Sequence, residues 1–148
     1  MLSRVDGMLV NEVMTKKIIT INPDDTVFNA CQKYHTNHIG CLIVTEKESC
    51  VGIVTERDII KKMICDYKDS KKTKVSEIMS ADVITIQSLE TLEKALKLMK
   101  KYKIKKLPVV SNNILVGIIT LSDIAHARPE LTKRFIDSWV RPRWDDEI

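Results

Sequence analysis

The strongest constraint on the fold of this chain is an internal duplication. A shift of 65 positions aligns residues 10–59 with residues 75–124 without a gap. Related segments recur along the whole alignment, from Val10-Asn11-Glu12-Val13-Met14 against Val75-Ser76-Glu77-Ile78-Met79 to Val51-Gly52-Ile53 against Val116-Gly117-Ile118. A duplication of this length predicts two similar structural repeats, each of which buries surface that a single copy would leave exposed.

Each repeat carries one short motif: Gly, two β-branched residues, Thr, two variable residues and Asp. The copies occupy residues 52–58 and 117–123. The Thr hydroxyl can cap a helix that follows an apolar strand, and the Asp then lies where the helix dipole favours an anion. Thr-x-x-Asp is close to a capping box, so the motif has a purely structural interpretation. It also has a functional one, because such a junction offers N–H groups to a phosphate and a carboxylate to ribose hydroxyls.

Hydrophobic periodicity predicts the same order of elements in both repeats. In the first repeat we expect a turn at residues 10–14, a strand at 18–21 and a helix that begins after Pro23-Asp24-Asp25. A hairpin with strands at 41–44 and 50–54 and a second helix at 55–65 follow. In the second repeat the first helix and the hairpin strands are expected at residues 89–102, 107–110 and 114–119. The helix at 55–65 is predicted to bury four apolar residues, Ile59, Ile60, Met63 and Ile64.

Composition narrows the class of protein. The chain has 148 residues, a hydrophobic share of 44% and a formal charge of +4, which is ordinary for a soluble domain and does not by itself indicate a nucleic-acid binder. No apolar run approaches the roughly 20 residues of a membrane helix, and the first residues lack a signal-peptide core. The four cysteines form no C-x-x-C pair and have no histidine at zinc-ligand spacing. We therefore expect reduced thiols, a cytoplasmic protein and no metal site.

The repeats resemble a tandem pair of CBS (cystathionine-β-synthase) domains over about residues 10–127. The resemblance rests on the Val-x-Glu-(Val/Ile)-Met openings, the two Ile-Thr-Ile strands and the two Gly-to-Asp motifs. It implies an α/β (α+β) fold of two β-α-β-β-α repeats packed about a pseudo-twofold axis, and a homodimer of such pairs. The expected boundaries are 8–66 for repeat 1, 67–74 for a polar, solvated linker, 75–127 for repeat 2, and 128–148 for a C-terminal helix and tail.

The resemblance also implies a regulatory role. Proteins of this kind bind AMP, ADP, ATP or S-adenosylmethionine in clefts between the two repeats and signal to a partner by a change of shape. No other cofactor is required. In the family the motif Asp holds the ribose hydroxyls, the motif Thr lies near the phosphate, the first strand of the opposite repeat lines the base pocket, and a basic residue before a Leu-Pro strand meets the phosphate.

Carried over to this sequence, the family pattern implies two candidate sites. Site 1 comprises Thr120, Asp123 and Lys106 together with Thr15, Lys16, Lys17, Ile18 and Ile19. Site 2 comprises Thr55, Asp58 and Arg57 together with Ser80, Ala81, Asp82, Val83 and Ile84.

The two sites differ in charge. The position that matches Lys106 in the first repeat is Cys41, which cannot pair with a phosphate, and Asp82 adds a negative charge to site 2. Site 1 instead has three lysines, Lys16, Lys17 and Lys106. We therefore expect site 1 to be the better anion binder, while Arg57 either restores part of the charge at site 2 or is a surface residue.

Two other functions remain open. One is a structural dimerisation or interaction module without a ligand, which the departures at Cys41 and Asp82 favour. The other is nucleic-acid binding through the Lys-rich edge at residues 100–106, although these lysines also suit a solvated helix end. We do not expect an enzyme, because no nucleophile–base pair, Walker loop or dinucleotide motif is present.

The C-terminal tail adds one further surface. An apolar stripe that includes Trp139 follows Pro129, and Trp144 lies beyond it. This stripe either closes over its own module or meets another subunit or a partner protein. We favour the contact role, since Trp is enriched among buried anchors at interfaces.

Overall fold

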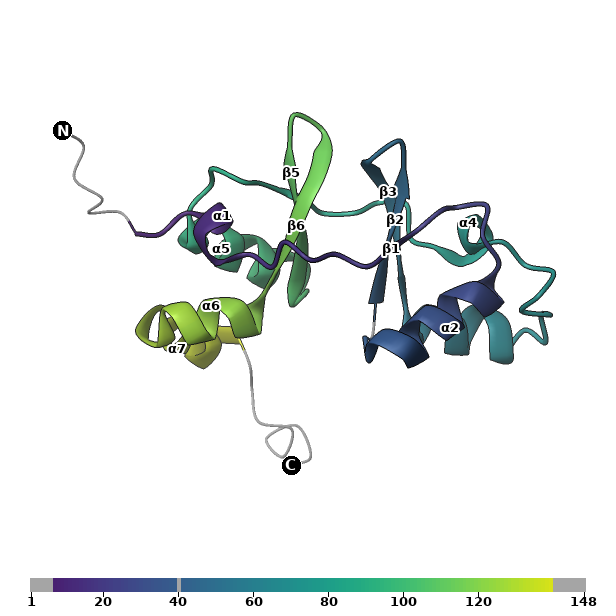
Figure 1. Cartoon of the computed structure of the whole chain (residues 1–148). Helices are drawn as coiled ribbons and strands as arrows, with labels where there is room; N and C mark the ends of the chain where they lie inside the picture. The colour runs from purple at the N-terminus through teal and green to yellow at the C-terminus, as the bar shows by residue number, and fades with distance from the viewer. Residues whose placement is uncertain (1–6, 40, 140–148) are drawn as a thin grey trace, which may run out of the picture. The chain divides into compact units, whose positions relative to one another are not determined.

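The computed structural model describes residues 7–39 and 41–139, which form two units (Figure 1). Within the described ranges, unit 1 comprises residues 7–16, 85–111 and 116–139. Unit 2 comprises residues 17–39, 41–84 and 112–115. Each unit contains one three-stranded sheet with helices, which confirms the predicted mixed α and β fold. No helix in the described part of the chain is both long and apolar enough to cross a membrane.

Unit 2 is built on a sheet with the strand order β1-β2-β3. Strands β1 and β2 pair in parallel, whereas β2 and β3 form an antiparallel hairpin. The predicted strand at 18–21 is shorter in the structure, because only its last two residues pair as β1. The elements are β1 Thr20–Ile21, α2 Val27–Asn37, β2 Cys41–Glu46, β3 Ser49–Thr55, α3 Glu56–Ile59, the π-helix η2 Ile60–Ile64, and α4 Val75–Ile78.

The helix after β3 departs from the prediction. The α3 helix gives way to the π-helix η2, in which the amide of Cys65 donates to the carbonyl of Ile60, five residues back, at 3.0 Å. Met63 is buried as predicted, but Ile60 and Ile64 are 54% and 67% exposed. The predicted burial of these two isoleucines is therefore wrong, because a π turn changes the angular spacing of side chains on which the periodicity depends.

The core of unit 2 lies between the sheet and its helices. Its members come from β1, β2, β3, α2, η2 and α4, and they are Ile21, Val27, Ala30, Tyr34, Leu42, Val44, Val54, Met63, Val75 and Ile78. Most of segment 67–74 is exposed, as its polar sequence indicates. Thr73 is nevertheless buried, and its carbonyl accepts a hydrogen bond of 2.9 Å from the amide of Val27. The end of this segment therefore packs against the start of α2.

Unit 1 repeats the arrangement with the strand order β4-β5-β6 and a parallel β4–β5 pair. Its buried residues include four from one face of α5, Leu92, Ala95, Leu96 and Met99. The elements are α1 Val10–Val13, β4 Ile86–Gln87, α5 Leu92–Tyr102, β5 Lys106–Ser111, β6 Ile114–Thr120, α6 Leu121–Ala127 and α7 Pro129–Trp139. The first two residues of β6 group with unit 2.

The C-terminal helix α7 packs against α5 and α6. Leu131 and Thr132 are buried there, at 7% and 2% exposure. The first part of the predicted C-terminal segment therefore closes over its own unit. The side chain of Trp139 and the whole of Trp144 lie outside the described residues, so the contact role assigned to them stays a prediction.

The opening segment of each sequence repeat packs in the unit built by the other repeat. In unit 1 the amide of Val10 donates to the carbonyl of Glu90 at 2.8 Å. In unit 2 the amide of Val75 donates to the carbonyl of Asp25, also at 2.8 Å. Helices α1 and α4 are thus exchanged between the two repeats, and each structural unit joins parts of the sequence that lie far apart.

Candidate ligand-binding sites

Both copies of the Gly-to-Asp motif form a capping box at a strand-to-helix junction. At the start of α6 the Asp123 amide donates to Thr120 Oγ1 at 3.0 Å, and the Thr120 amide donates to Asp123 Oδ2 at 2.9 Å. At the start of α3 the matching distances are 3.2 Å from the Asp58 amide to Thr55 Oγ1 and 2.9 Å from the Thr55 amide to Asp58 Oδ2. The capping predicted from the sequence is confirmed in both repeats.

The exchanged opening segments run directly beside these junctions. Thr15 and Ile118 exchange two backbone hydrogen bonds of 2.8 Å and 3.0 Å in unit 1. Ser80 and Ile53 do the same in unit 2, at 2.9 Å and 3.0 Å. Both strand partners, Ile118 and Ile53, lie two residues before the capping Thr, so the residue after each opening Met is held next to the helix start.

The motif glycines make this close approach possible. A methyl group on Gly117 would lie 3.0 Å from the Thr15 carbonyl oxygen, and one on Gly52 would lie 3.1 Å from the Ser80 carbonyl oxygen. Contacts between a carbon and an oxygen at this distance are too short for ordinary packing, so a larger residue would push the opening segment away. Glycine is therefore required at these positions because the opening segment passes close by, and not because the backbone turns there.

The structure divides the residues predicted for site 1 between the two units. Thr120 caps α6, Asp123 lies in its first turn, and Lys106 begins β5 as an exposed side chain. Thr15 and Lys16 belong to the same unit. The remaining three, Lys17, Ile18 and Ile19, belong to unit 2, where Ile19 packs against the core, so their part in site 1 stays a prediction.

All residues predicted for site 2 belong to unit 2. Thr55 and Asp58 form the capping box, and Arg57 is an exposed side chain in the same helical turn. After Ser80, which pairs with β3, the chain continues through exposed residues to half-buried ones, and these are Ala81, Asp82, Val83 and Ile84. Cys41 pairs with Thr55 across the β2–β3 ladder, which places a thiol beside the junction where site 1 has Lys106.

One residue at site 2 was missed by the sequence analysis. The ammonium of Lys62 lies 3.4 Å from Asp58 Oδ1 and donates to the carbonyl of Ile78 at 2.9 Å. Both oxygens of the Asp58 carboxylate are therefore occupied, one by the capping box and one by Lys62. Three residues beyond the end of the gapless alignment, the same shift of 65 positions places Ala127 opposite Lys62.

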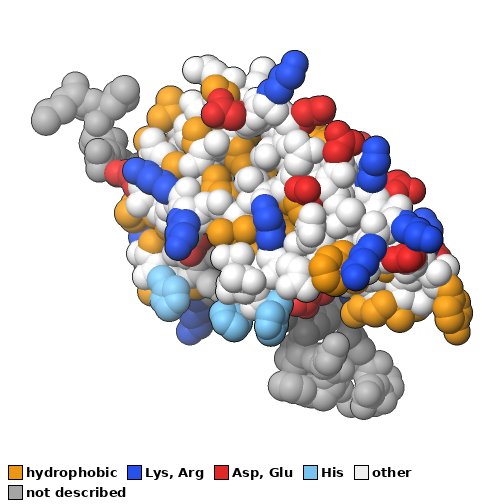
Figure 2. Space-filling model, turned by 45° about the vertical axis from the view of Figure 1, so that its right-hand side comes forward, with side chains coloured by type: hydrophobic (Ala, Val, Ile, Leu, Met, Phe, Trp, Pro, Cys, Tyr) orange, Lys and Arg blue, Asp and Glu red, His pale blue; other side chains and the backbone are white. Residues whose placement is uncertain are grey.

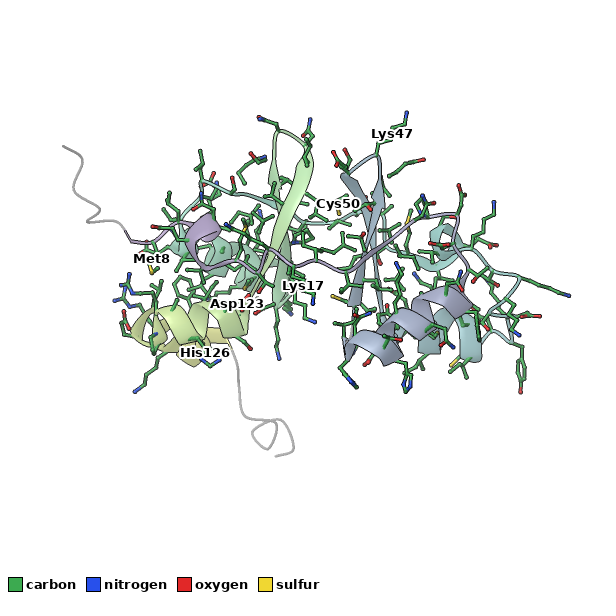
Figure 3. The ribbon with its side chains drawn as sticks, viewed as in Figure 1. Met8, Lys17, Lys47, Cys50, Asp123 and His126 are labelled. Carbon is green, nitrogen blue, oxygen red and sulfur yellow. The ribbon has the colours of Figure 1, made fainter. Side chains whose placement is uncertain are left out.

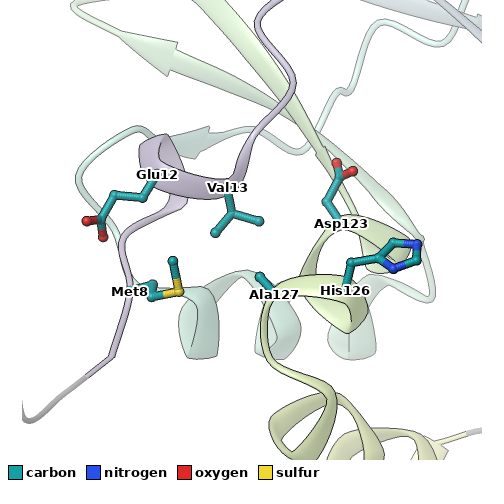
Figure 4. A pocket seen from close by; sticks show the side chains of 6 residues that line it. All are labelled: Met8, Glu12, Val13, Asp123, His126 and Ala127. Carbon is teal, nitrogen blue, oxygen red and sulfur yellow. The ribbon is translucent and has the colours of Figure 1, made fainter.

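Unit 1 has an open pocket beside Asp123 (Figures 3 and 4). Its volume is about 370 Å³, and the lining residues are Met8, Glu12, Val13, Asp123, His126 and Ala127. The first three come from α1 and the segment just before it, and the last three come from α6, which lies opposite. In the close-up the carboxylate of Asp123 points away from the imidazole of His126. Among the described residues, Asp123 Oδ1 has no protein partner, in contrast to its counterpart in Asp58.

Burial keeps two of the cysteine thiols, those of Cys31 and Cys50, in the protonated form. Burial raises the pKa of the Cys31 thiol. Burial also raises the pKa of Cys50, and a backbone contact at Gly52 offsets this only in part. Both thiols are therefore protonated and weakly reactive near neutral pH. In the part of the chain that the structure describes, no three His, Cys, Asp or Glu side chains are grouped as metal ligands.

The Lys-rich edge lies at the end of α5. Lys100 and Lys101 belong to the last turn of this helix, and Lys103 is its C-cap with a left-handed backbone. Cations at this position complement the negative end of the helix dipole. In the face shown in Figure 2, basic side chains are interspersed with acidic ones rather than gathered into a single patch.

Comparison with known proteins identifies the family. Residues 10–64 and 75–130 each match the CBS domain family. The chain is 36% identical over 124 residues to an uncharacterized protein of Methanopyrus kandleri, and the match covers 82% of this chain and 63% of that protein, less than two thirds of its length. It is 34% identical over 116 residues to the CBS domain-containing protein YhcV of Bacillus subtilis, with 78% of this chain and 82% of that protein covered.

A solved structure supports the same family assignment. The CBS domain pair of protein MJ0100, in complex with 5′-methylthioadenosine and S-adenosyl-L-methionine, is 30% identical to this chain with a TM-score of 0.71. The match covers 81% of this chain and 94% of that one. With two family matches that together span most of its length, this chain belongs to the CBS domain family as a tandem pair.

Proposed function

We propose that this chain is a regulatory module that binds an adenosine-type ligand, such as AMP, ADP, ATP or S-adenosylmethionine, at the α6 junction around Asp123. Ligand binding favours one conformation of the pair, and a partner protein recognises that conformation. We further propose that the module catalyses no reaction itself, acts in the cytoplasm and works as a homodimer. The non-catalytic role and the homodimer rest on membership of the family, and the cytoplasmic location rests on the reduced cysteines that the sequence predicts.

The observation that carries the proposal is the state of the Asp123 carboxylate. One oxygen accepts the Thr120 amide at 2.9 Å, which fixes the direction of the side chain. The other oxygen has no partner among the described residues, and the side chain lines the pocket of about 370 Å³. A carboxylate held in this way can accept hydrogen bonds from a ribose diol, and each hydrogen bond to a charged group contributes about 1.5–3 kcal/mol.

Two further observations support the choice of ligand and site. The MJ0100 pair, a structural neighbour at 30% identity, is in complex with two adenosyl compounds. Two of the lysines expected at site 1, Lys16 and Lys106, belong to the same unit as Asp123, and we expect them to meet a phosphate or carboxylate group of the ligand. At site 2 the position that matches Lys106 holds Cys41, and Asp82 adds a negative charge where site 1 has lysines.

The test is a thermal-shift series with AMP, ADP, ATP, S-adenosylmethionine, NAD and GTP. A ligand present at about a hundred times its dissociation constant should stabilise the fold by roughly 2.7 kcal/mol. The Asp123→Asn variant keeps an oxygen for the Thr120 amide but loses the charge, so the apparent affinity should fall at least about tenfold while the unliganded protein stays folded. The matched control is Asp58→Asn, which should retain binding at site 1.

Three results would speak against the proposal. An Asp123→Asn variant that binds like the parent would exclude the ribose role. No shift with any compound would favour the structural interaction module. Binding to nucleic acid that weakens steeply with salt and ignores Asp123→Asn would favour the Lys-rich edge at residues 100–106.

A further inference from the structure

Lys62 occupies one junction of the chain and has no counterpart at the other. Its ammonium lies 3.4 Å from Asp58 Oδ1 and 2.9 Å from the carbonyl oxygen of Ile78, which it meets as a hydrogen-bond donor. The Ile78 carbonyl ends the short helix α4, so it is one of the acceptors that a helix leaves without an internal partner. Lys62 thus ties the motif carboxylate of unit 2 to the exchanged segment beside it.

In unit 1 the same three positions hold Asp123, Val13 and Ala127. All three line the open pocket of about 370 Å³. In unit 2 the Lys62 side chain bridges the motif carboxylate and the end of the exchanged helix, whereas in unit 1 the matching residues surround a pocket (Figure 4). The two junctions therefore share a backbone design but differ in whether their own chain fills the position next to the carboxylate.

We propose that Lys62 is a built-in occupant that closes the Asp58 junction, so that each chain binds one adenosine-type ligand, at the Asp123 junction. This inference rests on the function proposed above. A ribose diol at Asp58 would have to displace an ammonium from one carboxylate oxygen while the capping box holds the other. At Asp123 the corresponding oxygen is available without any displacement.

The strength of the closure comes from two contacts made by one group. A half-exposed ion pair four residues apart on a helix contributes little alone, and the Lys62 side chain is 42% exposed. The additional hydrogen bond to the Ile78 carbonyl fixes the ammonium in place, and the Asp58 side chain is only 14% exposed while Lys62 covers it. Displacement should therefore weaken ligand binding at this junction by about tenfold or more, the factor that 1.4 kcal/mol represents.

The experiment is calorimetric titration of the full chain with AMP and, in parallel, with S-adenosylmethionine. The parent chain should bind one equivalent. Lys62→Ala should bind two, and Lys62→Ala combined with Asp58→Asn should return to one. The reciprocal variant Ala127→Lys places an ammonium four residues after Asp123 and should weaken binding at the first site about tenfold.

Two control variants make the result decisive. Lys61→Ala removes an exposed neighbouring lysine that contacts neither junction group and should leave the stoichiometry at one. Lys62→Met keeps the apolar stem without the ammonium, and it should open the second site even if Lys62→Ala does not fold.

The outcomes separate this inference from the proposed function. Two equivalents on the parent chain, or one equivalent on both Lys62 variants, would overturn the role of Lys62 and leave the proposed function standing. No binding to the parent or to any variant would overturn the proposed function, and this inference with it.

Discussion

The sulfur of Met14 lies where a side chain at position 117 would begin: a methyl group on Gly117 would be 2.5 Å from Met14 Sδ. The same relationship holds between Gly52 and Met79, again at 2.5 Å. The Met that ends each opening segment therefore packs directly against the Gly that begins the motif of the other repeat. These two parts of the repeat signature depend on each other. Each pair lies within one structural unit but spans two sequence repeats.

The first prediction follows from this contact. Gly117→Ala should lower the free energy of unfolding by about 1–3 kcal/mol, because the added methyl overpacks the space between Met14 and Thr15. Urea denaturation followed by circular dichroism measures the change. The double variant Gly117→Ala/Met14→Ala should recover part of the loss, with a coupling energy of about 0.5–3 kcal/mol for residues in contact. Strictly additive single effects would contradict the proposed contact.

The second prediction concerns pH. The Tyr34 hydroxyl donates to the carbonyl of Val54 at 2.6 Å, and burial, with the nearby thiols of Cys41 and Cys31, raises the pKa of Tyr34 above its usual value. A tyrosine in an unfolded chain titrates near pH 10. The stability that comes from this difference is fully present below about pH 10 and is lost as the pH rises toward the folded-state pKa, because the unfolded state ionises first.

The comparison that isolates this group is the parent against Tyr34→Phe. At pH 7 the variant should be less stable by about 1 kcal/mol, since it loses one buried hydrogen bond. Above pH 10 the difference between the two proteins should shrink, which unfolding curves in urea between pH 7 and pH 11 can measure. A difference that stays constant over this range would show that Tyr34 has the same pKa in both states.

The third prediction concerns thiol reactivity. Cys65 is exposed, whereas Cys31 and Cys50 are half-buried and have a raised pKa from burial. Iodoacetamide at pH 7.5, with peptide mass spectrometry as the readout, should therefore modify Cys65 first. The labelling rates of Cys31 and Cys50 should rise with pH as thiolate forms. In urea all four cysteines should react at similar rates, which provides the control, and rapid labelling of Cys31 in the folded chain would contradict the burial.

Much of the fold could be predicted because its signals are local and occur twice. A hydroxyl at the end of an apolar strand followed by a carboxylate three residues later specifies a helix start, and both capping boxes, at Thr55 and Thr120, form as predicted. The helix openings at Thr26 and Thr91 follow the same local chemistry, since each hydroxyl accepts an amide hydrogen bond from three residues on. Signals of this kind depend on a few neighbouring residues, so a single sequence contains them.

The π-helix after α3 could not be predicted in this way. Ile59, Ile60, Met63 and Ile64 have the spacing of an apolar α-helical face, yet Ile60 and Ile64 are exposed. The helix widens at Ile60–Ile64 because of a hydrogen bond that spans five residues. The spacing of apolar residues does not show whether a helix will form this bond or the ordinary α-helical one. The helix was therefore expected at the right residues but with the wrong helical geometry, and two of its four predicted core residues are exposed.

The contacts of Lys62 were missed for a different reason. A lysine next to another lysine on a surface helix is ordinarily a solvated charge, and the sequence gives no sign that Ile78 lies within reach. That proximity exists only because α4 is exchanged into unit 2. The one available signal was the Ala127 that the 65-residue shift places opposite Lys62, just beyond the aligned stretch, and this difference gains meaning only once the exchange is known.

The exchange of opening segments also has a consequence for the origin of the chain. A polypeptide with one repeat would carry an opening segment but could not complete its own unit, because that segment packs in the unit of the other repeat. Two separate molecules would have to trade openings to satisfy both. Fusion of the two copies makes this association intramolecular, at an effective concentration set by the short connection between the repeats. This chain thus carries the architecture of a two-molecule assembly within a single gene product.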